Sequence, residues 1–270
     1  MIVCMYGFIL WTGLLSFTKS RMMPQWEYVG FEQYIRLFEN PRWHVALDNL
    51  AVFLILFIAI SLALGLLLAI FLDQKIRNEG VIRTIYLYPM AISFIVTGTA
   101  WKWILNPGLG IEKIFRDMGF LDFEFRWLVE QDMAIYTIVI AAVWQSSGFV
   151  MAMFLAGLRG VDDNLVKAAK IDGASTFRSY WHVILPIMRP VFFSAVVILT
   201  HIAIKSFDLV QALTGGGPGY SSDLPANFMY TFAFNRAQMG LGAASAMVML
   251  FGVLAVLIPY LYSELRERET

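Results

Sequence analysis

Charge, cysteine and catalytic motifs are all scarce in this chain of 270 residues. Only 15% of the residues are charged and 59% are hydrophobic, whereas soluble domains are about one quarter charged, so a soluble globular protein is excluded. Equal numbers of basic and acidic residues leave no net charge, so the chain lacks the overall positive charge that would indicate nucleic-acid binding. The single cysteine, Cys4, excludes an internal disulfide and a cysteine metal cage. No Ser-His-Asp set, metal motif or Walker A sequence is present, so we expect neither an enzyme nor a cofactor or metal site.

Long apolar segments dominate what remains, and the mean hydropathy is +0.67. A helix needs about 20 mostly apolar residues to cross a bilayer, where only helical backbone satisfies its own polar groups. The apolar segments predict six transmembrane helices, over residues 1–18, 49–72, 84–104, 134–158, 190–210 and 237–263. We therefore expect an all-α integral membrane protein with one domain over residues 1–270. The first segment could also be a cleaved signal peptide, but it lacks a basic start and a cleavage pattern.

The basic residues predict which side of the membrane each loop faces. Lys and Arg are denser in loops 73–83 and 159–189 and in the C-terminal tail than in the other connections. Loop 73–83, for example, carries Lys75, Arg77 and Arg83. By the positive-inside rule, loop 159–189 and both termini are expected in the cytoplasm. The expected location is a bacterial cytoplasmic (inner) membrane, crossed several times.

Loop 159–189 carries helix signals of its own. Asp162 or Asp163 can cap a helix over residues 165–171, and Gly173 can take the left-handed conformation that ends it. Ser175 can cap a second helix, which we expect to end before Pro186. By these signals alone, the loop could equally be an ordinary amphipathic connection.

The motif Ala168-Ala169-x-x-Asp172-Gly173-Ala174, followed by Leu185-Pro186, resembles the EAA loop of importer-type ABC permeases. The resemblance implies a type I ABC importer permease fold in which this cytoplasmic loop docks on an ATPase. The implied partners are a second homologous permease subunit, an ABC ATPase dimer that binds ATP and Mg, and a solute-binding protein. The implied coupling residues are Lys167, Ala168, Ala169, Asp172, Gly173, Ala174, Leu185 and Pro186. Lys167 departs from the family pattern, which has Glu at this position.

The segment 206–219 contains a Thr-Gly-Gly-Gly-Pro run that resembles a signature of the maltose-related carbohydrate branch. The resemblance implies that Gly215, Gly216, Gly217 and Pro218 contact the solute-binding protein, although a tight turn would use the same residues. A phosphate loop is not expected, because no Lys-Ser/Thr follows the glycines. Segments 73–77, 86–90, 100–107 and 259–266 are similar to glucose/mannose-type permeases, which implies a monosaccharide as the transported solute. Another sugar or a polyol is the alternative.

Polar residues inside two of the predicted spans are candidates for solute binding. His201, Lys205 and Asp208 share one helix face by spacing, and Lys205 and Asp208 could pair as a clamp or bind sugar hydroxyls. In an ion-coupled secondary transporter, the rival class, the same two could relay protons. The resemblance to maltose-type permeases implies sugar contacts for a further set: Trp144, Gln145, Ser146, Phe149 and Ser206. Helix packing through small polar residues is the alternative for these positions.

Overall fold

The computed structural model describes residues 2–74 and 76–269, so Met1, Lys75 and Thr270 lie outside the described part of the chain. That part is helical, apart from one isolated bridge between Thr18 and Tyr28. The α-helices are α1 (Ile2–Ser16), α2 (Glu32–Phe38), α3 (Pro41–Asp73), α4 (Glu79–Ala91), α5 (Phe94–Ile104), α6 (Ile111–Asp117), α7 (Ala134–Arg159), α8 (Asp163–Ile171), α9 (Thr176–Ser179), α10 (Leu185–Ile187), α11 (Arg189–Ile204), α12 (Asp208–Leu213), α13 (Pro225–Tyr230) and α14 (Met239–Glu269). Two π-helical turns, Tyr180–Ile184 and Thr231–Asn235, complete the set. The all-α prediction is confirmed.

Three of the predicted spans are single long helices. By length and composition, α3, α7 and the Met239–Tyr260 part of α14 can each cross a membrane, and up to 5 spans result if two bent helix pairs each count as one. The bent pairs are α4 with α5, and Thr176–Ile187 with α11. The first apolar segment forms α1, whose 15 residues extend about 22 Å, short of a hydrocarbon core about 30 Å thick.

The core lies where α3 packs along α7. Buried residues of α3 recur every four positions and form one stripe that faces α7: Phe53, Phe57, Ser61, Gly65 and Ala69. Gly65 lets the helices approach closely, because a Cβ there would meet the Val150 side chain. Many large apolar side chains outside this core are exposed, as the lipid-facing surface of a membrane protein requires.

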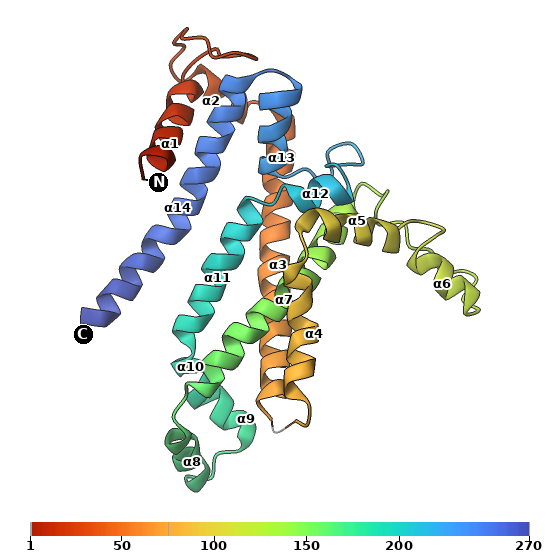
Figure 1. The fold of residues 1–270 in the computed structure, drawn as a ribbon, viewed down its shortest axis with the longest axis vertical. Coiled ribbons are helices and arrows are strands. Elements are labelled where there is room, and N and C mark those ends of the chain that lie inside the picture. Colours follow the sequence, from red (N-terminus) through yellow and green to blue (C-terminus); the bar gives the residue numbers. More distant parts are fainter. Residues whose placement is uncertain (1, 75, 270) are drawn as a thin grey trace.

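Residues 84–104 do not form one helix, which corrects the predicted third span. The chain leaves helical geometry at Ile92 and Ser93, and α5 departs from α4 at 100° (Figure 1). Pro89 lies in the last turn of α4 and supplies no N–H donor, and Ser93 caps α5 by accepting from the Val96 amide. A proline followed by a helix cap therefore explains the break.

The predicted span 190–210 also divides into two helices. α11 ends at Ile204 with Lys205 as its C-cap, and α12 begins at Asp208. Asp208 is thereby placed in a first helical turn, where its charge suits the helix dipole. His201, Lys205 and Asp208 therefore do not share one helix face. No ion pair joins Lys205 to Asp208 among the described residues, so the expected clamp is wrong.

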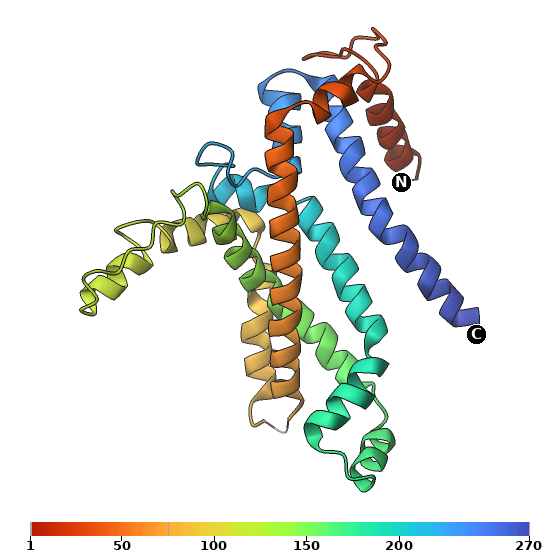
Figure 2. The same ribbon diagram turned by 180° about the vertical axis from the view of Figure 1, so that it is seen from behind.

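The long helices place α8 and α9 at one end of the molecule and α2 and α13 at the other (Figure 1). Figures 1 and 2 both show α1 and α14 side by side, and the two helices pack along each other. The N-terminal end of α1 and the C-terminal end of α14 both point toward the end that carries α8 and α9. The N-terminal end of α1 and the C-terminal end of α14 thus share one direction with the end that carries α8 and α9.

Candidate functional site

A cavity of about 390 Å³ lies at the break between α4 and α5. Its walls are residues 90–94 of the break, Gln145, Ser146 and Phe149 of α7, and Ile202 of α11. Its size falls within the range of about 300–1,000 Å³ that is typical of small-molecule sites. A smaller cavity of about 170 Å³ shares Phe94 and Ile202 with it and extends to Lys205, Ser206 and Asp208. The two cavities together form the candidate solute site.

Gln145 is the central polar side chain of the larger cavity. It is only 3% exposed, and its Nε2 donates a hydrogen bond of 2.7 Å to the Ile92 carbonyl oxygen at the helix break. Its Oε1 has no hydrogen-bond partner among the described residues. The amide therefore holds the break with its donor, and its acceptor is buried and unused among the described residues.

A close helix contact supports this position of Gln145. A Cβ on Gly148, one turn further along α7, would clash with the Tyr86 carbonyl oxygen of α4. The missing side chain lets the two backbones approach, which places the end of α4 against α7. The geometry of the cavity thus depends on a glycine that does not itself line it.

The structure brings six of the seven predicted solute-binding residues to these cavities. Gln145, Ser146 and Phe149 line the larger one, and Lys205, Ser206 and Asp208 line the smaller one. Trp144 lines neither: it is 41% exposed and packs edge-on against Trp101, with 5.9 Å between ring centroids.

Sequence reasoning missed the break residues and Ile202. Pro89 followed by Ser93 was the available signal for the break, whereas Ile202 carries no polar signal at all.

The loop 159–189 folds largely as its helix signals predict. Asp162 caps α8 by accepting from the Asn164 amide at 2.9 Å, and Ser175 caps α9. Gly173 has a φ of +80°, which confirms the left-handed stop. The Gly173 amide donates to the Lys170 carbonyl and the Ala174 amide to the Ala169 carbonyl, the two bonds of a Schellman motif. The turn is therefore fixed by backbone geometry.

Pro186 does not follow the end of the second helix, which corrects that prediction. The helical path continues from α9 through the π-helical turn Tyr180–Ile184 into α10, which contains Leu185 and Pro186. The Leu185 amide bonds to the Tyr180 carbonyl five residues back, so the chain is wound more widely just before the proline. Pro186 then occupies the start of α10, where its missing N–H costs little.

The surface of this loop presents apolar as well as small residues. Ile171 is 85% exposed, and Phe177 and Trp181 are exposed and stack with their ring planes 12° apart. Lys167, Ala168, Asp172 and Gly173 are also exposed. At the root of the loop, Arg159 pairs with Glu79 at 2.8 Å. An exposed apolar and small-residue surface of this kind is suited to protein docking.

At the opposite end of the molecule, the glycine run forms a tightly bonded turn. Thr214 Oγ1 accepts from the Gly216 amide at 3.2 Å, and the single O–H of Ser222 is shared between Thr214 Oγ1 at 2.8 Å and the Gly217 carbonyl at 2.7 Å. Gly215 and Gly216 have φ values of +66° and +87°. A Cβ on Gly216 would also meet Asp223 Oδ1, so glycine is required there by both conformation and space.

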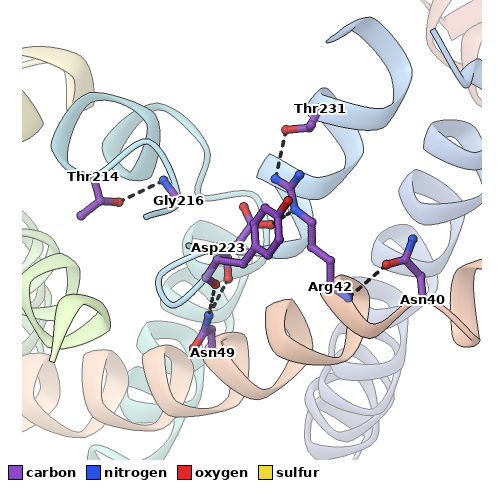
Figure 3. A network of polar contacts seen from close by, with 8 residues as sticks. Asn40, Arg42, Asn49, Thr214, Gly216, Asp223 and Thr231 are labelled. Atoms are coloured by element: carbon purple, nitrogen blue, oxygen red, sulfur yellow. Dashed lines mark hydrogen bonds and ion pairs between the residues drawn. The ribbon is translucent and has the colours of Figure 1, made fainter. Parts of the chain in front are cut away.

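A buried ion pair anchors this turn to α3 (Figure 3). Arg42 Nε lies 2.6 Å from Asp223 Oδ2, and the Asp223 side chain is fully buried. Arg42 also donates to Thr231 Oγ1, and Asn49 donates to the Asp223 carbonyl at 3.0 Å. Burial raises the pKa of the Asp223 carboxyl, and the hydrogen bond and charge of Arg42 oppose that rise. Sequence reasoning missed this network, because its members lie far apart in the chain.

Neither the cavities nor the loops offer a metal site. Within residues 2–74 and 76–269, no group of three His, Cys, Asp or Glu side chains is placed to hold an ion. The arrangement consists of an apolar cavity with a few polar groups and two ordered loops at opposite ends. The larger cavity can hold a small solute.

These features define a multi-spanning membrane transport subunit, and comparison with known proteins assigns its family. The profile of the family "Binding-protein-dependent transport system inner membrane component" matches residues 61–268. The chain belongs to this family, and within it to the carbohydrate branch of ABC permeases. It is a transport subunit and not an enzyme.

Similar curated proteins extend over almost the whole chain. A probable ABC transporter permease of Pyrococcus horikoshii is 39% identical over 96% of this chain and 90% of its own length. The xylose/arabinose import permease protein XacH of Haloferax volcanii is 34% identical over 99% and 85%. The trehalose/maltose transport system permease protein MalF of Thermococcus litoralis is 30% identical over 88% and 80%.

Solved structures confirm the type I ABC importer permease fold. A chain of a bacterial alginate ABC transporter, in complex with alginate pentasaccharide-bound periplasmic protein, superimposes with a TM-score of 0.82 at 17% identity. The match covers 100% of this chain and 91% of that chain. An amino acid ABC transporter gives a TM-score of 0.55 at 16% identity over 87% and 95%.

Proposed function

We propose that this chain is the permease subunit of an ATP-driven importer for a monosaccharide of the glucose or mannose type. The observation that carries the proposal is the cavity at the α4–α5 break, where the polar residues Gln145 and Ser146 stand among apolar walls. A sugar presents hydroxyl donors on its rim and apolar C–H groups on its faces, and Phe149 supplies a ring for such a face. Neutral acceptors suit a neutral polyol.

The smaller cavity extends this solute path. Lys205, Ser206 and Asp208 offer charged and hydroxyl groups that can hydrogen-bond a hydroxyl-rich solute as it passes. Trp144 contacts the solute only if its ring leaves Trp101. Relatives in the family are named as permeases for several sugars, among them xylose/arabinose and trehalose/maltose. The restriction to a glucose- or mannose-type hexose rests on the sequence resemblance.

The loop 159–189 transmits ATPase movement to the spans in this proposal. One ABC ATPase dimer binds ATP and Mg, and each ATPase docks on the α8 region of one permease. The surface around Lys167, Ala168, Ala169 and Asp172 supplies the contact, and the Gly173 turn fixes the angle between α8 and α9. Because the chain carries one such loop, a second, homologous permease subunit completes the transporter.

The membrane orientation follows from the same assignment. Loop 159–189 faces the cytoplasm, and both termini point toward that side, since α1 and α14 share its direction (Figure 2). The glycine turn at residues 215–218 then faces outward and contacts the solute-binding protein that delivers the sugar. The ordered turn and its buried anchor Arg42–Asp223 give that protein a rigid surface.

The decisive experiment is uptake by the reconstituted transporter. Proteoliposomes with ATP inside and the solute-binding protein outside should accumulate labelled hexose, and uptake should stop without ATP. Gln145→Ala should raise the sugar concentration for half-maximal uptake, whereas Ser147→Ala, on the same helix but outside the cavity, should leave it unchanged. Uptake that needs no ATP and follows a proton gradient would establish the secondary transporter instead. Accumulation of a pentose or disaccharide in preference to hexose would refute the hexose assignment alone.

A further inference from the structure

A strongly basic pocket lies at the end of the molecule opposite the loop 159–189. Its volume is about 350 Å³, and it is enclosed by the segment after α1, by α2 and by the turn before α14. Four cations and two amides dominate its lining: Lys19, Arg21, Arg36, Arg236, Gln33 and Gln238. No acidic residue lines the pocket. Among the described residues, the only acidic partner of these cations is Glu27, 4.0 Å from Lys19.

The walls of this pocket are ordered by hydrogen bonds. Gln33 is 3% exposed and donates to the Thr18 carbonyl, and the Gly240 amide donates to the Ser20 carbonyl. The adjoining Ala237 has a φ of +52°, a conformation that residues other than glycine rarely adopt. The fixed backbone thus brings four exposed cationic side chains to one pocket, where they attract an anion.

A separate apolar groove lies between α1 and α14, the two helices whose ends adjoin the pocket. It has a volume of about 260 Å³ and is lined by Phe8, Ile9, Thr12, Ala246, Met247 and Leu250. Ala246 follows Gln238 of the basic pocket by eight positions, which is about 12 Å along a helix. The cationic pocket and the apolar groove therefore follow one another along α1 and α14, in the order of the phosphate and the acyl chain of a lipid.

The surroundings place the pocket at the membrane surface. Met22, Met23, Trp26 and Tyr28 lie beside it and are 61–80% exposed. Trp26 also packs edge-on against Trp11 of α1, with ring centroids 5.2 Å apart. Exposed Trp and Tyr residues mark the headgroup depth of a bilayer.

We propose that the α1–α14 seam binds one anionic glycerophospholipid, with its phosphate among the four cations and an acyl chain in the groove. The positive charge of the pocket favours a phosphate group. The apolar groove favours a lipid over a free anion, because only a lipid carries an acyl chain. The lipid belongs to the outer leaflet, a detail that rests on the proposed orientation, whereas the site itself does not. A bound lipid would fix α1 to α14.

Lipid binding can be measured on the purified, delipidated transporter by native mass spectrometry during titration with phosphatidylglycerol. One lipid per chain should bind, diacylglycerol should not, and millimolar inorganic phosphate should not displace the lipid. Displacement by inorganic phosphate would make this a free-anion site and overturn the proposal. A pocket that binds no lipid but contributes to affinity for the solute-binding protein would overturn it as well.

Charge variants test the headgroup contact. Arg36→Gln with Arg236→Gln should weaken phosphatidylglycerol binding roughly 30-fold, since each cation near anionic lipid contributes about 1 kcal/mol and 1.4 kcal/mol is a factor of ten. Lys113→Gln with Arg126→Gln removes the same charge around α6, remote from the seam (Figure 1), and should leave binding unchanged. Equal loss in both pairs would refute a specific site.

A matched pair of apolar substitutions tests the acyl contact. Ala246→Phe fills the groove without changing charge and should weaken binding of long-chain lipid, whereas Ala255→Phe, at an exposed position on the same helix, should not. If Ala246→Phe fails to fold, the charge pair still decides the proposal. Unchanged lipid binding in a folded Ala246→Phe transporter would refute the acyl contact.

Discussion

Replacing Arg42 with methionine should strongly destabilise the end of the protein that carries the glycine turn. Methionine keeps much of the side-chain volume but leaves the fully buried Asp223 carboxylate without its partner at 2.6 Å. Removing one member of a buried ion pair costs about 3–5 kcal/mol, because the remaining charge stays in a poorly solvating environment. For a domain of this size, that loss lowers the melting temperature by on the order of 10 °C. The melting temperature is measured by thermal unfolding of the purified transporter, followed by tryptophan fluorescence.

The pH dependence identifies Asp223 as the cause. Burial raises the pKa of Asp223, and Arg42→Met removes the cation that opposes the rise, so the pKa climbs further above its unfolded value. A carboxyl with a raised folded pKa contributes stability that is present at low pH and lost as the pH rises through that pKa. The deficit of Arg42→Met should therefore be largest at neutral pH and shrink on acidification.

A second substitution separates the lost charge pair from lost packing. Asp223→Asn in the Arg42→Met background replaces the stranded carboxylate with a neutral amide and should restore most of the melting temperature. The double variant should also lose the pH dependence of the deficit. If the deficit of Arg42→Met is independent of pH and persists with Asp223→Asn, the packing of the Arg42 stem stabilises the turn and the electrostatic reasoning is refuted.

Three further predictions concern two glycines and one serine hydroxyl. Gly148→Ala places a Cβ against the Tyr86 carbonyl and should cost about 1–3 kcal/mol of stability and impair uptake, whereas Gly252→Ala, with open space around it, should be neutral in melting experiments. Gly173→Val forces a β-branched residue to a φ of +80°, so the transporter should hydrolyse ATP without uptake of solute. Gly173→Asn should retain the coupling of hydrolysis to uptake. Normal uptake by the valine variant would contradict the role of this turn. Ser222→Ala removes the O–H that Thr214 Oγ1 and the Gly217 carbonyl share, and should weaken affinity for the solute-binding protein, measured by titration. Unchanged affinity would exclude the turn from the contact.

Local signals predicted the loops better than the spans. Asp162, Gly173 and Ser175 act through hydrogen bonds and dihedral angles within a few residues, so their positions in the sequence carry the whole of the information. Hydropathy, in contrast, measures only how apolar a segment is. It could not show that residues 84–104 and 190–210 change direction, because broken and straight helices in a membrane have the same composition.

The sequence predicted several side chains of the candidate site but not their arrangement in space. The polar interruption at Gln145 and Ser146 stands out in an apolar helix and does line the cavity. The pairing of Lys205 with Asp208 failed because it assumed a continuous helix through residue 208. The Arg42–Asp223 pair joins residues far apart in the chain, and no local pattern links them before the fold brings α3 to the 214–224 turn.

The broken α4–α5 segment has a consequence for how solute choice can diverge among related permeases. Polarity at the cavity is supplied partly by the main chain, through the Ile92 carbonyl and the first turn of α5. Every amino acid carries the same peptide group, so substitutions at the break reshape the cavity without removing that polarity. If this cavity is the solute site proposed above, exchanges at Phe149 or Ile202 alter the size of the accepted solute without a new charged group at membrane depth, where such groups are costly. With such a helix break, the solute specificity of a permease can change through the shape of the cavity alone.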